Sequence, residues 1–158
     1  MAGLMKALIY KGPKSVEYGD WPVAVLFANN GKPEAVIRVE ASGLCGSDVL
    51  TYLGQDPHRS APLILGHEAA GTIEGGPRSG QRVAINPLVT CGACDPCSAG
   101  QTNLCANREL LSVLPRQGAL AQYVSVPYGN LIPIPDDVAF ETACLVKPMA
   151  CGWHVARL

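Results

Sequence analysis

The sequence lacks three features that would point to nucleic acid, membranes or export. Its formal net charge is −1 and no block of like charges appears, so a polyanion such as DNA meets no electrostatic attraction. No apolar run approaches the roughly 20 residues of a membrane span, and Met1 to Tyr10 contains no apolar stretch long enough for a secretory signal. We therefore expect a cytoplasmic protein that binds neither nucleic acid nor membranes.

Nucleotide-binding glycine motifs are also missing. Among the 17 glycines no two are separated by a single residue, so the G-x-G-x-x-G fingerprint that brings a pyrophosphate to a helix N-terminus cannot occur. No G-x-x-x-x-G-K-[ST] loop is present either. We expect no nucleotide-binding site made by this chain alone.

Length and composition indicate one compact domain. The chain has 158 residues, of which 48% are hydrophobic and 16% charged. A chain of about 150 residues buries roughly two-thirds of its unfolded surface in a single core. Seven cysteines without an export signal are better explained by metal binding or reduced thiols than by disulfides.

Short apolar runs between glycines and prolines predict many short strands. They cover residues 7–10, 35–41, 69–73, 82–85, 121–126 and 131–134. This pattern favours a mainly β fold, either a barrel or a sandwich. Helix is expected only in a short stretch after Cys45 and over residues 138–158, where Pro148 breaks the helix or restarts it as a first-turn proline.

Four cysteines lie close together in the sequence, at Cys91, Cys94, Cys97 and Cys105. Zinc takes four thiolates at about 2.3 Å, and such a closed shell leaves no position for water, which makes the site structural. Gly92, Pro96 and Gly100 supply the turns that let neighbouring sulfurs face one point. Unliganded thiols and an iron–sulfur cluster are the alternatives. The gap before Cys105, with no proline after it, argues against the cluster.

A second set of metal-ligand residue types lies upstream. Cys45 is followed by Ser47 and Asp48, and after a gap of 21 residues by His67 and Glu68. A cysteine, a histidine and a carboxylate are ligand types of an open zinc site. Taken singly, such residues are more often core thiols or hydrogen-bonded scaffolding. The conjunction is what predicts a site.

Several motifs in this order resemble one protein family. They are Met5-Lys6-Ala7-Leu8, the stretch from Val39 to Asp48, Gly66-His67-Glu68-Ala69-Ala70-Gly71, Gly80-Gln81-Arg82-Val83, the four-cysteine segment and the stretch from Gly118 to Val124. The sequence resembles the zinc-containing medium-chain dehydrogenases, and within them the sorbitol, galactitol and threonine dehydrogenase branch. The resemblance implies a GroES-like, partly open β-barrel over residues 1–158. It also implies that residues 138–158 form a helical link toward a Rossmann domain that this chain lacks.

The resemblance assigns a role to each residue of the second set. Cys45 and His67 would bind a catalytic zinc, and Glu68 would be a third ligand or a carboxylate that swings onto the metal. Asp48 would accept a hydrogen bond from the His67 ring and fix its tautomer. Ser47 would accept the proton of the substrate hydroxyl. The zinc would lower the pKa of the bound alcohol, and the resulting alkoxide would expel a hydride to NAD(P).

Two positions depart from the family pattern. The family commonly has a histidine that relays the proton near the position of Leu50. Leucine cannot carry a proton, so a neighbouring side chain or solvent would have to relay it instead. Where the branch usually has a glutamate facing the zinc it has Lys147, whose charge opposes the metal. Cys151 is a candidate replacement ligand, although Cys144 and Cys151 are more simply interpreted as buried helix residues.

These observations predict the catalytic domain of a zinc-dependent NAD(P) oxidoreductase. The expected substrate is a small secondary alcohol, a polyol or sugar alcohol, which is oxidised to a ketone. We expect about one or two bound zinc ions, no activity from the chain alone, and a homo-oligomer for the full-length form. The alternative is a zinc-stabilised binding module without chemistry, which Leu50, Lys147 and the missing cofactor domain all permit.

Overall fold

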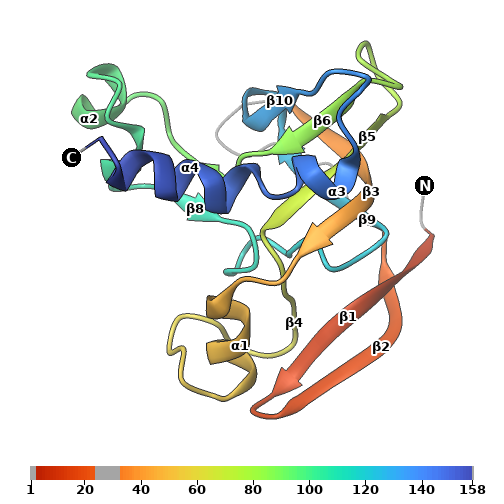
Figure 1. The fold of residues 1–158 in the computed structure, drawn as a ribbon. Coiled ribbons are helices and arrows are strands. Elements are labelled where there is room, and N and C mark those ends of the chain that lie inside the picture. The colour runs from red at the N-terminus through yellow and green to blue at the C-terminus, as the bar shows by residue number, and fades with distance from the viewer. Residues whose placement is uncertain (1–2, 24–32, 158) are drawn as a thin grey trace.

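The computed structural model describes residues 3–23 and 33–157, which form a mainly β fold with short helices (Figure 1). Its largest sheet has the strand order β10-β6-β5-β3-β9, and every pairing in it is antiparallel. The strands are β3 (Glu34–Gly43), β5 (Glu68–Glu74), β6 (Arg82–Ile85), β9 (Tyr123–Pro127) and β10 (Leu131–Pro133). Long strand β3 lies between β5 and β9 and contacts both.

A second sheet has three strands in the order β2-β1-β4. They are β1 (Leu4–Gly12), β2 (Ser15–Pro22) and β4 (Leu63–Ile64). Ala7 of β1 bridges to Ala121, and the Leu8 N–H donates to the Leu120 carbonyl. Because Ala121 leads into β9, this link joins the two sheets into a curled half-barrel. The partly open β-barrel predicted from the sequence is confirmed.

The main core is built from alternate residues of the five-stranded sheet. Pairs two residues apart, which point to the same face of a strand, are buried together in one cluster: Ala35 and Ile37, Val83 and Ile85, Val124 and Val126. The other face of β5 is covered by helix α3 (Phe140–Ala143), where Ala70 packs against Ala143 and Cys144. Both faces of β5 are therefore buried, which fixes the strand that carries Glu68.

The remaining elements are short. They are helices α1 (Gly46–Tyr52), α2 (Asp95–Ser98) and α4 (Val146–Val155), the 3-10 turns η2 (Thr102–Leu104) and η3 (Tyr128–Asn130), and the two-stranded sheet of β7 (Leu88–Val89) and β8 (Glu109–Leu110). Helix α4 extends away from the five-stranded sheet (Figure 1), and none of its residues is buried. Within the described ranges, no helix has the length and apolarity to cross a membrane.

The structure refines the predicted elements at their ends. Each of the six predicted strand segments overlaps a strand, although the segment 121–126 becomes strand only from Tyr123. The helix expected over 138–158 is two helices, α3 and α4, and it is described only as far as residue 157. Pro148 lies in the first turn of α4, where the missing N–H would have no partner within the helix.

Candidate metal centres

The four predicted zinc cysteines converge on one point. Their sulfur atoms all lie within 4.8 Å of one another, with Cys91 Sγ at 3.6 Å from Cys105 Sγ and at 4.0 Å from Cys97 Sγ. Four thiolates bound to zinc at about 2.3 Å would lie about 3.8 Å apart. None of the cysteines forms a disulfide. The cluster has the donor chemistry and spacing of a closed tetrahedral zinc site.

Local backbone turns bring these sulfurs together. Gly92 and Gly100 both adopt φ of +76°, a left-handed conformation that glycine takes without steric cost. Cys94 caps the N-terminus of α2, and Pro96 lies in the first turn of that helix. The β7–β8 pair closes the base of this segment, so the lobe is held at both ends.

The thiols of this cluster differ in acidity. Hydrogen bonds from the backbone N–H groups of Ala93 and Cys94 lower the pKa of Cys91 to about 6. Removal from water, reinforced by the neighbouring thiols, raises the pKa of Cys97 to about 11. Thiolates this close repel one another, so full ionisation of the cluster needs a cation among the sulfurs.

The second predicted set also comes together. Donor atoms of Cys45, His67 and Glu68 lie within 4.8 Å of one another. The pairing of β3 with β5 explains this, because Gly43 lies opposite Glu68 and Cys45 follows two residues later as the N-cap of α1. His67 and Glu68 are buried, with 3% and 5% of their surface exposed, so these donors are held in place.

Asp48 supports this cluster from the first turn of α1. Its carboxylate accepts the Cys45 N–H at 3.0 Å and the Gly66 N–H at 3.2 Å, and lies 3.7 Å from His67 Nδ1. Burial raises the pKa of Asp48, but the His67 ring and the two N–H groups outweigh it, so the pKa lies below the usual aspartate value. Asp48 is therefore an anion that is hydrogen-bonded beside Cys45 and lies near His67, although 3.7 Å is longer than the hydrogen bond predicted between Asp48 and the His67 ring.

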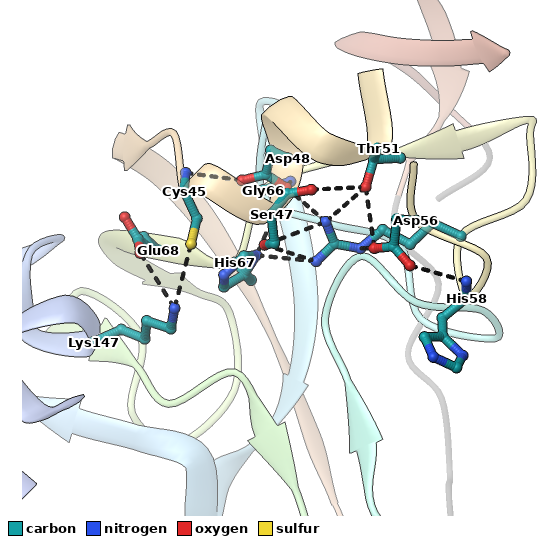
Figure 2. Close-up of polar contacts among 11 residues, drawn as sticks. Cys45, Ser47, Asp48, Thr51, Asp56, His58, Gly66, His67, Glu68 and Lys147 are labelled. Carbon is teal, nitrogen blue, oxygen red and sulfur yellow. Dashed lines mark hydrogen bonds and ion pairs between the residues drawn. The ribbon is translucent and has the colours of Figure 1, made fainter. Parts of the chain in front are cut away.

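Arg59 is a site residue that the sequence reasoning missed. It is buried, and its guanidinium donates to Asp48 Oδ1 at 3.3 Å and to Thr51 Oγ1 at 3.0 Å. It also reaches Ser47 Oγ and His67 Nδ1, each at 3.5 Å. Figure 2 shows Ser47, Asp48, Thr51 and His67 around these contacts. Arg59 lies in a polar loop that matches none of the motifs above, so no sequence signal marked it.

Lys147 lies on the other side of the cluster, as Figure 2 shows. Its Nζ is 3.5 Å from Cys45 Sγ and 3.4 Å from Glu68 Oε1. Partial burial lowers the pKa of Lys147, but the anionic Cys45 and Glu68 raise it above the usual lysine value overall. Burial raises the pKa of the Cys45 thiol, yet hydrogen bonds from Ser47, with His67 and Lys147, bring it below the usual value.

The prediction that Cys144 and Cys151 are buried is correct for Cys144 and wrong for Cys151. Cys144 is buried, as expected, and its thiol donates to the Glu141 carbonyl at 3.2 Å. Cys151 is exposed, not buried, because α4 turns none of its side chains into the core. It belongs to neither donor cluster found among the described residues, so the structure offers no support for Cys151 as a replacement ligand.

Fold and donor sets define a class: a curled β domain that carries one closed and one open group of metal-ligand residues. The family described as "Alcohol dehydrogenase GroES-like domain" matches residues 31–136. The chain belongs to this family, within the zinc-containing medium-chain alcohol dehydrogenases, as the sequence motifs predicted.

Named relatives agree with this assignment. The chain is 33% identical to L-galactonate-5-dehydrogenase of Escherichia coli K12 and 35% identical to sorbitol dehydrogenase of Bacillus subtilis, and these matches cover 97% and 96% of it. Among solved structures, RspB of Escherichia coli CFT073 in complex with NADH superposes with a TM-score of 0.84 at 33% identity over 97% of the chain. The chain spans less than half of these proteins, 45%, 44% and 45% of their respective lengths.

Proposed function

We propose that this chain is the catalytic, zinc-binding domain of an NAD(P)-dependent oxidoreductase that oxidises a secondary alcohol, a polyol or sugar alcohol, to a ketone. The observation that carries the proposal is the convergence of Cys45, His67 and Glu68, from two separate segments, within 4.8 Å. These are the ligand types of an open zinc site, which keeps a position for substrate. The relatives named for L-galactonate and sorbitol support a polyhydroxylated substrate.

Each residue of the open cluster has a distinct task in this reaction. Cys45, His67 and Glu68 would hold a zinc ion, which would supply a Lewis acid that makes an alcohol more acidic. The Asp48 carboxylate, paired with Arg59, holds the His67 ring in the orientation of a ligand. Ser47 is half-buried, and its hydroxyl would accept the substrate proton. Leu50 is 47% exposed and carries no proton, so we assign the exit of that proton to water around Ser47.

We propose that the nicotinamide cofactor is bound by another part of a longer protein, which packs against α4. Two observations support this. The related structure that contains NADH is more than twice as long as this chain. Helix α4 presents large apolar side chains to solvent, with Met149, Trp153 and Val155 between 65% and 69% exposed. Several large apolar side chains exposed on one short helix are typical of an interface. Residues 138–158 are then the helical link between the two parts.

Two further expectations remain predictions. All seven cysteines are free thiols, which suits a reducing compartment such as the cytoplasm. A homo-oligomer of the full-length form is expected from the family resemblance alone. The alternative function, a zinc-stabilised binding module without chemistry, is favoured by Lys147, whose ammonium contacts two of the three donors of the open cluster.

Activity in a fused protein distinguishes the two functions. We would join this chain, through α4, to the cofactor domain of the Bacillus subtilis sorbitol dehydrogenase and load it with zinc. Reduction of NAD⁺ or NADP⁺ by sorbitol, galactitol and L-threonine would be followed by absorbance. We expect oxidation of at least one polyol by the fusion and none by the chain alone.

Matched variants identify the residues responsible. In the fusion, Cys45→Ser should lower kcat about a hundredfold or more, because it removes a ligand to the Lewis acid. Lys11→Gln changes an exposed lysine of β1, outside both clusters and away from α4, and should leave the rate unchanged. A zinc-loaded, folded fusion that oxidises no alcohol, or that is unaffected by Cys45→Ser, would support the binding module instead.

A further inference from the structure

The open cluster contains a cation of its own. Lys147, in the first turn of α4, places its Nζ 3.5 Å from Cys45 Sγ and 3.4 Å from Glu68 Oε1. Cys45 lies 102 positions away in the sequence and Glu68 lies 79 positions away. The Glu68 side chain is only 6% exposed, so this ammonium faces a carboxylate that water barely reaches. The contact is a bridge between two donors that would otherwise repel each other as anions.

The two contacts of this ammonium have the lengths expected between neighbouring ligands of a zinc ion. Bond lengths of about 2.0–2.3 Å place the ligands of a tetrahedral zinc about 3.3–3.8 Å from one another. Both Lys147 contacts fall in that range. The lysine thus lies at ligand distance from two of the three donors of the open cluster. A divalent ion among the same donors would meet a positive charge at ligand distance, which opposes its binding.

We infer that Lys147 is a tethered counter-cation of the open cluster: it bridges Cys45 and Glu68 when no metal is bound, and it must leave before a divalent ion can bind there. The Lys147 side chain is 25% exposed, so its ammonium can turn into water by rotation of the side chain alone. The inference rests on the proposed function only in taking this cluster as a metal site.

The four-cysteine cluster and the open cluster should therefore differ in their affinity for a divalent metal ion. Residues 91–105 contain no lysine or arginine, so no positively charged side chain within that segment competes with a metal. The open cluster offers zinc one thiolate where the other cluster offers four, and a lysine must be displaced from it. The four-cysteine cluster fills first, and the open cluster fills only at higher metal concentration. Removing the lysine charge should tighten the open cluster and leave the other unchanged.

Cobalt binding measures this directly, because thiolate-to-Co²⁺ absorption reports each cluster. The metal-free chain receives one equivalent of Zn²⁺ for the four-cysteine cluster and is then titrated with Co²⁺. We compare the native chain with Lys147→Gln, Lys147→Glu and the control Lys11→Gln, which removes an exposed lysine paired with Glu17. We expect Lys147→Gln to lower the Kd of the open cluster about tenfold or more. Lys147→Glu should lower it further, and Lys11→Gln should leave it unchanged.

Folding is checked within the same samples, because the Co²⁺ spectrum of the four-cysteine cluster, recorded without prior Zn²⁺, should be identical in all variants. Metal-free Lys147→Glu brings a third anion into the open cluster, so its Tm should fall below that of the native chain and recover when metal is added. Equal or weaker Co²⁺ binding by Lys147→Gln would overturn the inference while leaving the proposed metal site intact. Failure of every variant to bind a second ion would overturn both.

Discussion

At the scale of single residues, the open cluster depends on a buried charge network behind the ligands. Asp48 and Arg59 form an ion pair at 3.3 Å in which both side chains are almost fully buried, at 1% and 3% exposed. The pair gains hydrogen bonds from Gly66 to Asp48 and from Arg59 to Thr51. Removing one partner of a buried ion pair leaves the other charge buried without a counter-charge. This costs more stability than the loss of the contact itself.

Arg59→Met should therefore destabilise the domain strongly. We expect the free energy of unfolding to fall by about 3–5 kcal/mol, because the Asp48 carboxylate loses its cation inside the protein. Chemical denaturation of the zinc-loaded chain measures this. Arg38→Met is the matched control: Arg38 is 44% exposed and pairs with Glu40 and Glu74, so we expect a loss below about 1 kcal/mol. Equal losses for the two variants would refute the buried pair as a support of the site.

The site could be predicted residue by residue only where its members lie in a local pattern. Cys45, His67 and Glu68 were recognisable because each stands in a short motif, and the register of β3 on β5 then brings the motifs together. The contacts of Lys147 arise from packing between segments far apart in the sequence, whereas Arg59 contacts Asp48 and Thr51 of α1, which lie 11 and 8 positions away. The family resemblance placed Lys147 beside the metal but did not show that its ammonium contacts Cys45 and Glu68, and nothing in the sequence placed Arg59 at the site.

At the scale of elements, the approach of β5 to β3 positions Glu68. The strands are so close at Gly71 that a Cβ there would lie 2.1 Å from the Arg38 carbonyl oxygen. No real Cβ fits at that distance, so any larger residue must displace backbone. Because the same strand pair sets Gly43 opposite Glu68, a shift at Gly71 would also move a predicted ligand.

Gly71→Ala should lower both stability and metal affinity. We expect the free energy of unfolding to fall by about 1–3 kcal/mol from overpacking. Co²⁺ binding at the open cluster should weaken, while the four-cysteine cluster keeps its affinity. Gly129→Ala is the control, since a Cβ there meets nothing within 4 Å, and we expect a change within about 0.5 kcal/mol. A stable Gly71→Ala chain with unchanged Co²⁺ binding would contradict this role for the strand contact.

Strands were predictable from the sequence where their burial requires a run of apolar residues. The six strand segments were found because they are short apolar runs between glycines and prolines, and most of their residues are buried. Strand β2 was missed because its residues, from Ser15 to Pro22, are exposed or half-buried, and the strand is held by pairing with β1. Strands β4, β7 and β8 have two residues each, too few to show a period. Their existence depends on partners that a local pattern does not reveal.

At the scale of the whole molecule, the four-cysteine lobe is expected to depend on its metal for rigidity. It contains two very short helical turns, α2 and η2, and the described hydrophobic clusters include no residue from 91 to 105. A segment with so little apolar packing needs another source of stability. A zinc ion among four sulfurs supplies it, because metal binding to a site absent from the unfolded chain adds directly to folding.

Metal removal should therefore expose this lobe selectively. With zinc bound, iodoacetamide should modify exposed Cys151 quickly and spare Cys91, Cys94, Cys97 and Cys105. After chelation the four should become reactive and the Tm should fall. Mass spectrometry of peptides identifies the labelled cysteines. The control Cys151→Ser leaves both clusters intact, so its Tm should fall on zinc removal as much as that of the native chain. Equal labelling of all cysteines in the zinc-loaded chain would contradict a metal-bound lobe.

The central claim is that this domain holds zinc at two points, one closed by sulfurs and one open for an alcohol oxygen. Anomalous diffraction at the zinc edge, from crystals of the chain grown with excess Zn²⁺, tests it most directly. The account predicts one peak enclosed by the four cysteine sulfurs and a second peak between Cys45, His67 and Glu68, with the Lys147 ammonium displaced from its contacts. A single peak at the four-cysteine cluster, with Lys147 still bridging Cys45 and Glu68 at saturating zinc, would contradict it.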